Sequence, residues 1–294
     1  MDVSDTPDVV EVAAPAKVNL ALLVGPRRPD GYHEVFSPML PLTLADHVAA
    51  RHTSGKGLTV HCDVCPGDDN LAARMVRELE RRLERTFSAD VTITKRVPVA
   101  AGLGGGSSDA AAVLLAVERL FGLDLAPRLR YECAAAVGAD VAFFLWKGPQ
   151  LAMGRGNVLH EIELPEPLHL VVAVPDLRLS TAEVYGWFDD DAGADVPRFV
   201  ERTQRLLVRL REAQRPRDLA ALVENDLEAT VVARRPEVGE LKERLLAAGA
   251  YAAAMSGSGA GVFGLFSTGA RAQRALGALA PARTFYATDL QPRT

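Results

Sequence analysis

Apolar and polar residues alternate along the first predicted strand, residues 10–24. The alternation places one set of side chains on a single face, namely Val12, Ala14, Ala16, Val18, Leu20 and Leu22. Lys17 and Asn19 therefore share the opposite face, about 7 Å apart along the strand. A solvated strand face would ordinarily explain such a pair, but its neighbours on that face, Pro15 and Ala21, are small. Lys17 and Asn19 are therefore a candidate functional pair.

Several further elements are predicted in the first half of the chain. Apolar and β-branched runs predict strands near residues 42–51, 57–62, 91–94 and 141–146, and helices are predicted over 71–86, 110–120 and 128–137. A turn over residues 66–70 is expected to cap the first of these helices. Asp140 stands directly before the predicted strand 141–146, where it is either a turn residue or a functional acid.

The pattern restarts after residue 164, where Pro165 and Pro167 mark the predicted domain boundary. Strands are predicted over 168–174, 251–255, 261–266 and 283–289, and helices over 198–211, 217–234, 236–248 and 270–279. Ser180–Glu183 matches a capping box and opens one more helix, which carries Tyr185. This order is close to a ferredoxin-like split βαβ arrangement. We therefore expect an α+β chain with domains over residues 1–164 and 165–294.

A glycine-rich loop joins the strand at 91–94 to the helix at 110–120. Its residues are Gly102, Leu103, Gly104, Gly105, Gly106, Ser107 and Ser108. The glycines permit positive φ and leave the backbone uncovered, and the serines together with Asp109 stand where the helix needs N-caps. A bare loop before a helix N-terminus suits a phosphate group. A flexible linker is the weaker interpretation, because the loop joins two regular elements.

Two better-known phosphate loops do not fit this stretch. In G-x-G-x-x-G the third glycine would be residue 107, which is Ser. The G-x-x-x-x-G-K-[ST] loop needs a lysine, and none lies between Lys95 and Lys147. Lysine is scarce throughout, with only Lys17, Lys56, Lys95, Lys147 and Lys242.

Composition narrows the class of protein. The net charge of −5 disfavours a nucleic-acid binder, which usually carries a basic excess. No apolar run approaches the ~20 residues of a membrane span, and the acidic N-terminus does not resemble a secretion signal. We therefore expect a cytoplasmic protein. Cys62, Cys65 and Cys133 make no disulfide framework, and without a second C-x-x-C pair the stretch from His61 to Cys65 is a weak candidate for zinc.

A Pro-Asp-Gly turn at residues 29–31 places Tyr32 and His33 side by side. With the stretches Ala14–Asn19, Pro98–Ser108 and Ser256–Gly259, the chain resembles the GHMP family of small-molecule kinases. Four details, at residues 15–20, 28–33, 69–71 and 138–141, favour the members whose substrate carries a cytidine diphosphate group. The resemblance implies an S5-like N-terminal domain, a ferredoxin-like C-terminal domain and an active site between them.

The resemblance also implies roles for particular residues. Asp140 would be the catalytic base and Lys17 the charge stabiliser in ATP-dependent phosphorylation of a 2-hydroxyl, a step of non-mevalonate isoprenoid biosynthesis. ATP would be bound by Asn70, Leu71, Pro98, Ala101, Gly102, Leu103, Gly104, Gly105, Gly106, Ser107 and Ser108. The substrate would be bound by Asn19, Tyr32, His33, Asp140, Thr181 and Tyr185, with the two tyrosine rings stacking on the cytosine and the imidazole bonding to its edge. Mg²⁺ is implied with no assignable ligands, and we expect a monomer or weak homodimer without nucleic-acid or membrane partners.

Small departures and two alternatives accompany this interpretation. Ala142 replaces a proline common in the family, and Ala260-Gly261 replaces a larger pair, but neither removes a reactive group. Another family kinase, acting on mevalonate, homoserine or a sugar, is disfavoured by Tyr32 and His33, because those substrates have no base to stack. A nucleotide-binding sensor would be expected to lack Lys17 or Asp140.

Overall fold

The computed structural model describes residues 7–55, 57–65, 67, 70–191 and 193–290. The chain packs into two compact units that interleave along the sequence. Unit 1 holds residues 1–16, 45–97 and 104–147, and unit 2 holds residues 17–44, 98–103 and 148–294. A single domain boundary between residues 164 and 165 stays a prediction, since compact units need not coincide with family domains.

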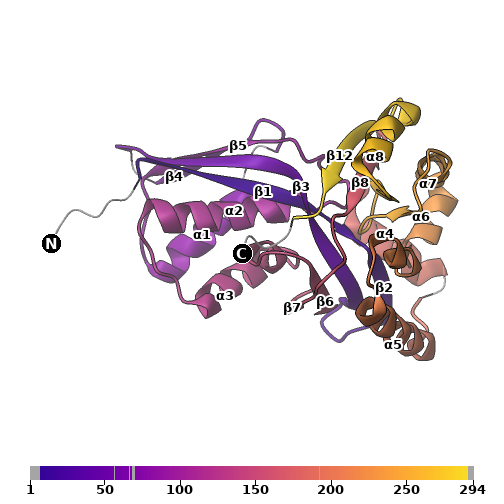
Figure 1. Cartoon of the computed structure of the whole chain (residues 1–294). Helices are drawn as coiled ribbons and strands as arrows, with labels where there is room; N and C mark the ends of the chain where they lie inside the picture. The colour runs from indigo at the N-terminus through magenta and orange to yellow at the C-terminus, as the bar shows by residue number, and fades with distance from the viewer. Residues whose placement is uncertain (1–6, 56, 66, 68–69, 192, 291–294) are drawn as a thin grey trace. The chain divides into compact units, whose positions relative to one another are not determined.

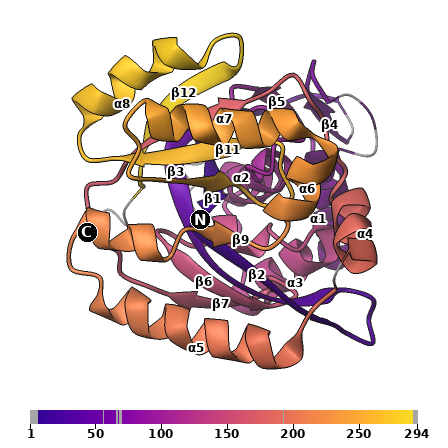
Figure 2. The same cartoon turned by 90° about the vertical axis from the view of Figure 1, so that its right-hand side faces the viewer.

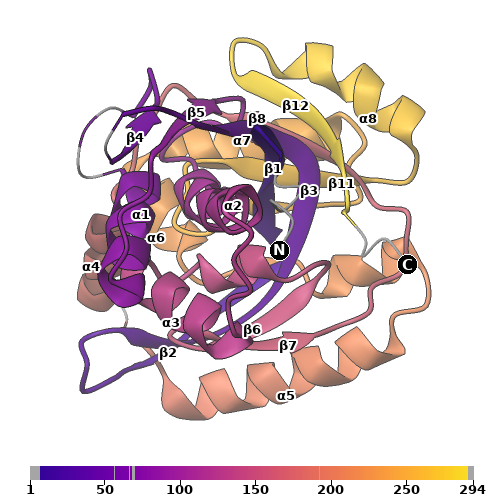
Figure 3. The same ribbon diagram turned by 90° about the vertical axis from the view of Figure 1, so that its left-hand side faces the viewer.

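Unit 1 combines a small sheet with three helices. In the sheet, β5 (Ala89–Thr94) lies antiparallel to the second half of β3 (His33–His52) and parallel to β4 (Leu58–His61). The helices are α1 (Leu71–Leu83), α2 (Gly105–Leu120) and α3 (Pro127–Val137), and α1 packs against both others (Figures 1 and 3). Helix α2 is rich in alanine and buried along most of its length, so its neighbours can approach its backbone closely.

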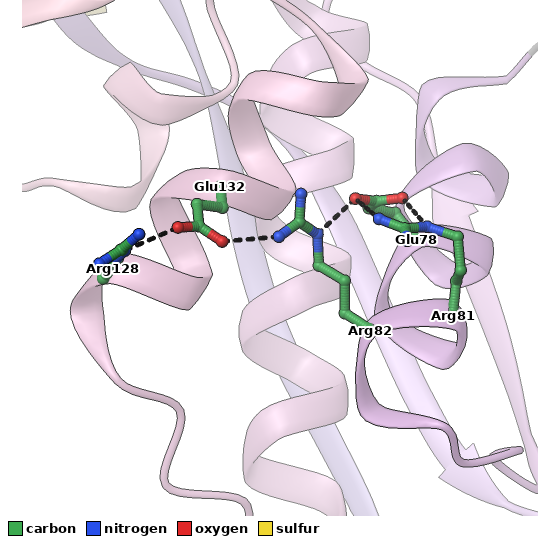
Figure 4. A network of polar contacts seen from close by, with 5 residues as sticks. All are labelled: Glu78, Arg81, Arg82, Arg128 and Glu132. Atoms are coloured by element: carbon green, nitrogen blue, oxygen red, sulfur yellow. Dashed lines mark hydrogen bonds and ion pairs between the residues drawn. The ribbon is translucent and has the colours of Figure 1, made fainter.

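Charged side chains join α1 to α3 (Figure 4). Glu78 accepts hydrogen bonds from Arg81 at 2.9 Å and from Arg82 at 2.5 Å within α1. Arg82 reaches across to Glu132 of α3 at 2.7 Å, and Arg128 binds the other oxygen of that carboxylate at 2.8 Å. The bond from Arg81, assisted by Arg82, lowers the pKa of Glu78 to about 2.

We expect replacement of Glu78 by glutamine to flatten the dependence of stability on acid. Because the folded-state pKa of Glu78 is depressed, its contribution is present above the ordinary value of about 4.5 and is lost as the pH falls through about 2. At neutral pH, Glu78→Gln should reduce the free energy of unfolding by ~0.5–1 kcal/mol. The difference in unfolding free energy between the two proteins should vanish near pH 2. Urea titrations between pH 2 and 7 measure it.

A matched control is Glu163→Gln. Glu163 is exposed and has no ion pair within the described part of the chain. Equal pH dependence of the wild type and Glu78→Gln would contradict the assignment of the pKa.

Unit 2 contains a four-stranded antiparallel sheet in the order β10-β11-β8-β12. Its strands are β8 (His169–Val174), β10 (Ala252–Met255), β11 (Val262–Phe266) and β12 (Arg283–Thr288). Helices α7 (Pro236–Ala247) and α8 (Gly269–Leu276) pack on this sheet, and α6 (Glu228–Arg234) packs on α7 (Figure 2). Counting only the strands of this sheet in chain order, the arrangement is 2-3-1-4, as expected of a ferredoxin-like fold. The α+β prediction is therefore confirmed.

The remaining strands of unit 2 carry most of the candidate site. Strand β1 (Val9–Asn19) enters the unit at Lys17 and is followed after one residue by β2 (Ala21–Arg27). Strand β2 pairs with the start of β3 and, in parallel, with the two-residue β9 (Glu224–Asn225). Strands β6 (Gln150–Gly154) and β7 (Val158–Glu161) extend the pairing of β3, and α5 (Val196–Glu212) packs against β2.

The main differences between prediction and structure concern four predicted elements. The strand predicted over 10–24 is two strands, β1 and β2, and the helix predicted over 110–120 begins at Gly105. The prediction that residues 107–109 cap this helix is wrong, because Gly104 is its N-cap, in a left-handed conformation. The predicted strand 141–146 is a 3₁₀ helix, η1 (Ala142–Leu145), since a short apolar run does not distinguish a strand from a buried helical turn.

The fourth difference is the helix predicted over 217–234. It is divided into the 3₁₀ helix η2 (Pro216–Ala221), β9 and α6, because Glu224 and Asn225 pair with β2 instead of continuing a helix. Strands β6 and β7 were not predicted.

Two sequence expectations concern membranes and cysteines. Among the residues that the structure describes, no helix has the length and apolarity to cross a membrane. Cys62, Cys65 and Cys133 are free thiols, and burial raises the pKa of both Cys65 and Cys133. The described residues contain no group of three or more His, Cys, Asp or Glu side chains that could hold a metal ion.

Candidate active site

Lys17 and Asn19 lie side by side at the end of β1, as the alternation predicted. Both are buried, at 4% and 5% exposure, and the Lys17 Nζ donates to Asn19 Oδ1 at 2.6 Å. The amide of Asn19 in turn donates from Nδ2 to Ser37 Oγ at 2.7 Å, and Ser37 donates to the Ala21 carbonyl at 2.6 Å. Ser37 thereby fixes which end of the Asn19 amide faces the ammonium group. Sequence reasoning missed Ser37, because a single serine inside a long apolar strand carries no distinguishing pattern.

The first part of the glycine-rich loop is interlocked with the second glycine-rich loop, Ser256–Gly261. The Ser256 hydroxyl donates to the Gly102 carbonyl at 3.0 Å, and the Gly261 N–H donates to the Ala101 carbonyl at 3.1 Å. The contact requires glycine: a Cβ at Gly102 would lie 1.9 Å from the Ser256 carbonyl oxygen. The Leu103 carbonyl accepts from the Lys17 N–H at 2.9 Å, which ties the loop to β1.

The second part of the loop forms the first turn of α2 in unit 1. Gly104 has a φ of +71° and supplies no side-chain cap, so the first N–H groups of α2 are left to other partners. Pro98 is buried just upstream. The Leu71 Cδ1 atom would be 3.7 Å from a Cβ at Gly106 and 3.8 Å from one at Gly138. The start of α1 and the residues before Asp140 therefore both lie against this turn.

Asp140 is half-buried in the turn between α3 and η1. The preceding Gly138 lies close to the loop, since a Cβ there would be 3.9 Å from Ser107 Oγ and 3.3 Å from Val141 Cγ2. Unit 1 thus brings the predicted base and the predicted phosphate loop into one neighbourhood. Asn70 has a structural role as well: it caps α1 through Ala72 N at 2.9 Å and donates to the Cys65 carbonyl at 2.9 Å. Of the predicted capping turn, Pro66, Asp68 and Asp69 lie outside the described residues.

A buried charge cluster that the sequence did not reveal supports the same turn. Lys95 Nζ lies 2.5 Å from Asp46 Oδ2 and 2.6 Å from Asp109 Oδ2, and it would be 3.3 Å from a Cβ at Gly105. Asp46 also accepts from the N–H groups of Arg96 and Val97. Burial raises the pKa of Asp109, an effect that Lys95 opposes. The cluster joins β3, the end of β5 and α2. It therefore holds in place the part of the glycine-rich loop that forms the first turn of α2.

The predicted base-binding residues all belong to unit 2. Tyr32 is 53% exposed, and the Arg155 guanidinium carbon lies 5.4 Å from its ring centre. His33 is buried, with its ring 5.5 Å from that of Tyr185, a residue of α4 (Thr181–Asp191). The Pro-Asp-Gly turn is confirmed, with the Gly31 N–H donating to the Arg28 carbonyl at 3.0 Å.

Both nitrogens of His33 face protein oxygens. Nδ1 lies 2.9 Å from the Gly25 carbonyl oxygen, and Nε2 lies 3.1 Å from Asp189 Oδ1, close enough for an ion pair although the angle is poor for a hydrogen bond. The imidazole would therefore have to leave Asp189 to bond to a base, and its predicted role in base recognition stays a prediction. Thr181 lies near the second glycine-rich loop, with its hydroxyl 3.0 Å from that of Ser258.

Comparison with known proteins identifies relatives along nearly the whole chain. Residues 70–148 match the N-terminal domain of the GHMP kinases, and residues 206–283 match their C-terminal domain. The chain is 42% identical to 4-diphosphocytidyl-2-C-methyl-D-erythritol kinase of Geobacter metallireducens, over 87% of this chain and 88% of that protein. It is 38% identical to the protein of the same name from Citrifermentans bemidjiense, over 96% of this chain and 98% of the other.

Solved structures agree with these sequence matches. A crystal structure of 4-(cytidine 5′-diphospho)-2C-methyl-D-erythritol kinase superposes with a TM-score of 0.80 at 36% identity, covering 96% of this chain and 99% of the other. Homoserine kinase from Cytophaga hutchinsonii superposes with a TM-score of 0.78 at 18% identity, covering 99% and 97%. The second likeness supports the fold alone.

Proposed function

The chain belongs to the GHMP kinases, and we propose that it transfers the γ-phosphoryl group of ATP to the free 2-hydroxyl of 4-diphosphocytidyl-2-C-methyl-D-erythritol, a step of non-mevalonate isoprenoid biosynthesis. The observation that carries this proposal is the near-full-length identity of about 40% to kinases that bear this substrate's name. The buried Lys17–Asn19 pair and the uncapped α2 N-terminus also support the proposal, because a kinase needs a cation and a phosphate-binding backbone.

Phosphoryl transfer asks the protein mainly to position groups and to neutralise charge. In the proposed mechanism Asp140 accepts the proton of the attacking hydroxyl, and Lys17 stabilises negative charge on the transferring group. Asn19 Oδ1 accepts a hydrogen bond from the Lys17 ammonium at 2.6 Å, and Asn19 Nδ2 donates to Ser37, so the cation is oriented before substrate arrives. Such preorganisation avoids rearrangement of charges during the reaction.

The phosphate groups of ATP would lie at the start of α2. Gly104 and Gly105 leave the backbone N–H groups there uncovered, and the positive end of the helix dipole favours an anion. The contact between Leu71 and the loop is consistent with an adenine site at the start of α1.

Magnesium fits this site through two buried oxygens. Ser108 Oγ and Asp109 Oδ1 are buried without a hydrogen-bond partner in the part of the chain described, and they follow the loop directly. Oxygen ligands suit Mg²⁺, which is commonly held by one or two protein oxygens together with substrate phosphates. We propose that Ser108 and Asp109 would hold the ion, which would shield the negative charge of the phosphates.

The substrate's cytosine would stack on Tyr32. Stacking of a base on an aromatic side chain is worth ~1–3 kcal/mol in nucleic-acid sites, so Tyr32→Ala should raise the KM for the cytidine-linked substrate by roughly 5–100-fold. The KM for ATP and the melting temperature should change little, because Tyr32 is more than half exposed. Steady-state kinetics and thermal melts measure both.

Tyr131→Ala is the matched control, since Tyr131 is an exposed tyrosine on α3. A Tyr32→Ala variant with lower stability and an unaltered KM would show that Tyr32 only packs the turn. Recognition of the base would then rest on His33 and Tyr185.

One assay tests the proposed function directly. ADP formation from ATP should be fast with the cytidine-linked substrate and negligible with mevalonate or homoserine. Turnover of mevalonate or homoserine instead would favour another kinase of the family, and ATP binding without turnover of any substrate would favour a nucleotide sensor. A cytoplasmic location and a monomeric or weakly dimeric state complete the proposal.

A further inference from the structure

Asn225 makes three hydrogen bonds that fix its side chain in one orientation. Its Nδ2 donates to the Met255 carbonyl at 2.7 Å and to the Gly257 carbonyl at 2.9 Å. Its Oδ1 accepts from the Leu227 N–H at 2.9 Å. Both amide hydrogens therefore bond to backbone carbonyls at Met255 and in the second glycine-rich loop, and the amide oxygen bonds to the backbone two residues after Asn225.

The backbone that Asn225 holds lies directly against the Lys17 ammonium. A Cβ at Gly257 would be 3.3 Å from Lys17 Nζ, and Gly257 has a φ of +56°, so this close approach requires glycine. The neighbouring Ser256 hydroxyl donates to the Gly102 carbonyl and lies 3.4 Å from the Asn19 N–H. Displacement of this second glycine-rich loop would therefore disturb both the Lys17 ammonium and the first glycine-rich loop.

Asn225 is itself held against the strands that carry the site. Residues Glu224 and Asn225 form β9, which pairs with the start of β2. Strand β2 begins just after Lys17 and Asn19 in the chain. Beside Asn225, Glu224 binds Arg202 of α5 at 2.6 Å. The pairing with β2 thus fixes the backbone that carries the amide.

From this geometry we infer that Asn225 is a positioning residue for the phosphoryl transfer, acting through the Met255–Gly257 backbone on Lys17. The inference rests on the proposed role of Lys17. Without the amide donors, the buried Met255 and Gly257 carbonyls lose their partners, and the loop must move to satisfy them. A displacement of about 1 Å at a reacting group can cost ~10²-fold in rate.

The test combines kinetics with a direct view of Lys17. Asn225→Ala should lower kcat by roughly 10–100-fold while the KM for ATP changes little. Asn225→Asp keeps the bond to Leu227 but turns a carboxylate oxygen toward two carbonyls, so it should lose at least as much. It provides a second variant of unchanged shape if Asn225→Ala does not fold.

Asp226→Asn is the matched control. Asp226 is the next residue, and its side chain binds Arg202 and the Val24 N–H, neither of which belongs to the loop. This variant should lose some stability and keep its kcat. A fall in kcat no larger for Asn225→Ala than for Asp226→Asn would overturn the inference.

Nuclear magnetic resonance of ¹³Cε-labelled lysine separates this inference from the proposed function. With only five lysines, the Lys17 signal can be assigned from Lys17→Arg. The signal should move in Asn225→Ala and stay in place in Asp226→Asn, and an unmoved signal in Asn225→Ala would contradict positioning. Normal turnover by Lys17→Met, which removes the positive charge, would instead refute the proposed role of Lys17, whatever the signal does.

Discussion

Replacement of Asp140 by asparagine should lower kcat by ~10²–10⁴-fold, the usual contribution of general-base catalysis. Asparagine keeps the shape of the side chain but cannot accept a proton. The KM for ATP should be nearly unchanged, because the phosphate loop and the start of α1 are anchored by Leu71, Lys95 and Asp46. Initial rates at saturating ATP and substrate measure the loss.

Asp90→Asn provides the control for removing a carboxylate from unit 1. Asp90 is on β5 and lies 3.7 Å from His61, away from the loop. Near-normal turnover by Asp140→Asn would mean that the base lies elsewhere or that the hydroxyl needs none. If Asp140 and Lys17 act together, Asp140→Asn combined with Lys17→Met should fall little below either single variant, because residues that act as a unit are not additive.

Much of the fold could be predicted from local patterns. Alternation placed Lys17 and Asn19 on one face of β1, and the apolar periods located α1, α3, α5, α7 and the strands of the ferredoxin-like sheet. These signals depend on residues close in sequence, which a single chain displays directly. The glycine loop was located in the same way, although its last glycines belong to α2.

The supporting contacts of the site could not be predicted, because they join distant residues. Asn225 reaches Gly257, and Lys95 reaches both Asp46 and Asp109. Nothing in the local pattern distinguishes these side chains from ordinary turn or surface residues. Likewise the break in the helix predicted over 217–234 follows from pairing with β2, a tertiary contact that overrides local helical preference.

The functional residues can therefore be recognised from the sequence more readily than the residues that orient them. Groups proposed to touch substrate or ATP occur in short motifs, which a family resemblance can identify. Groups that orient them, such as Ser37 and Asn225, act through hydrogen bonds to residues distant in sequence, and they become visible only in the folded chain.

The interlocked glycine-rich loops lead to the second large expected effect, in Gly102→Ala. Gly102 has a φ of +71°, and the added Cβ would lie 1.9 Å from the Ser256 carbonyl oxygen, where real Cβ atoms stay beyond 3.0 Å. The backbone of one loop must therefore move. We expect kcat/KM for ATP to fall by ~10²-fold or more, because this movement displaces groups at the reacting centre.

Two further variants separate the sources of this loss. Gly249→Ala adds a side chain at a φ of +97° with open space around it, so it should cost only ~1–2 kcal/mol of stability and leave turnover intact. Gly261→Ala places a Cβ 2.5 Å from the Ala101 carbonyl oxygen without a positive φ, so it tests the crowding alone and serves if Gly102→Ala does not fold. Thermal melts and ATP titrations of all three should rank Gly249→Ala as the mildest. If Gly102→Ala and Gly261→Ala both fold and turn over normally, the two loops do not act as one unit in catalysis.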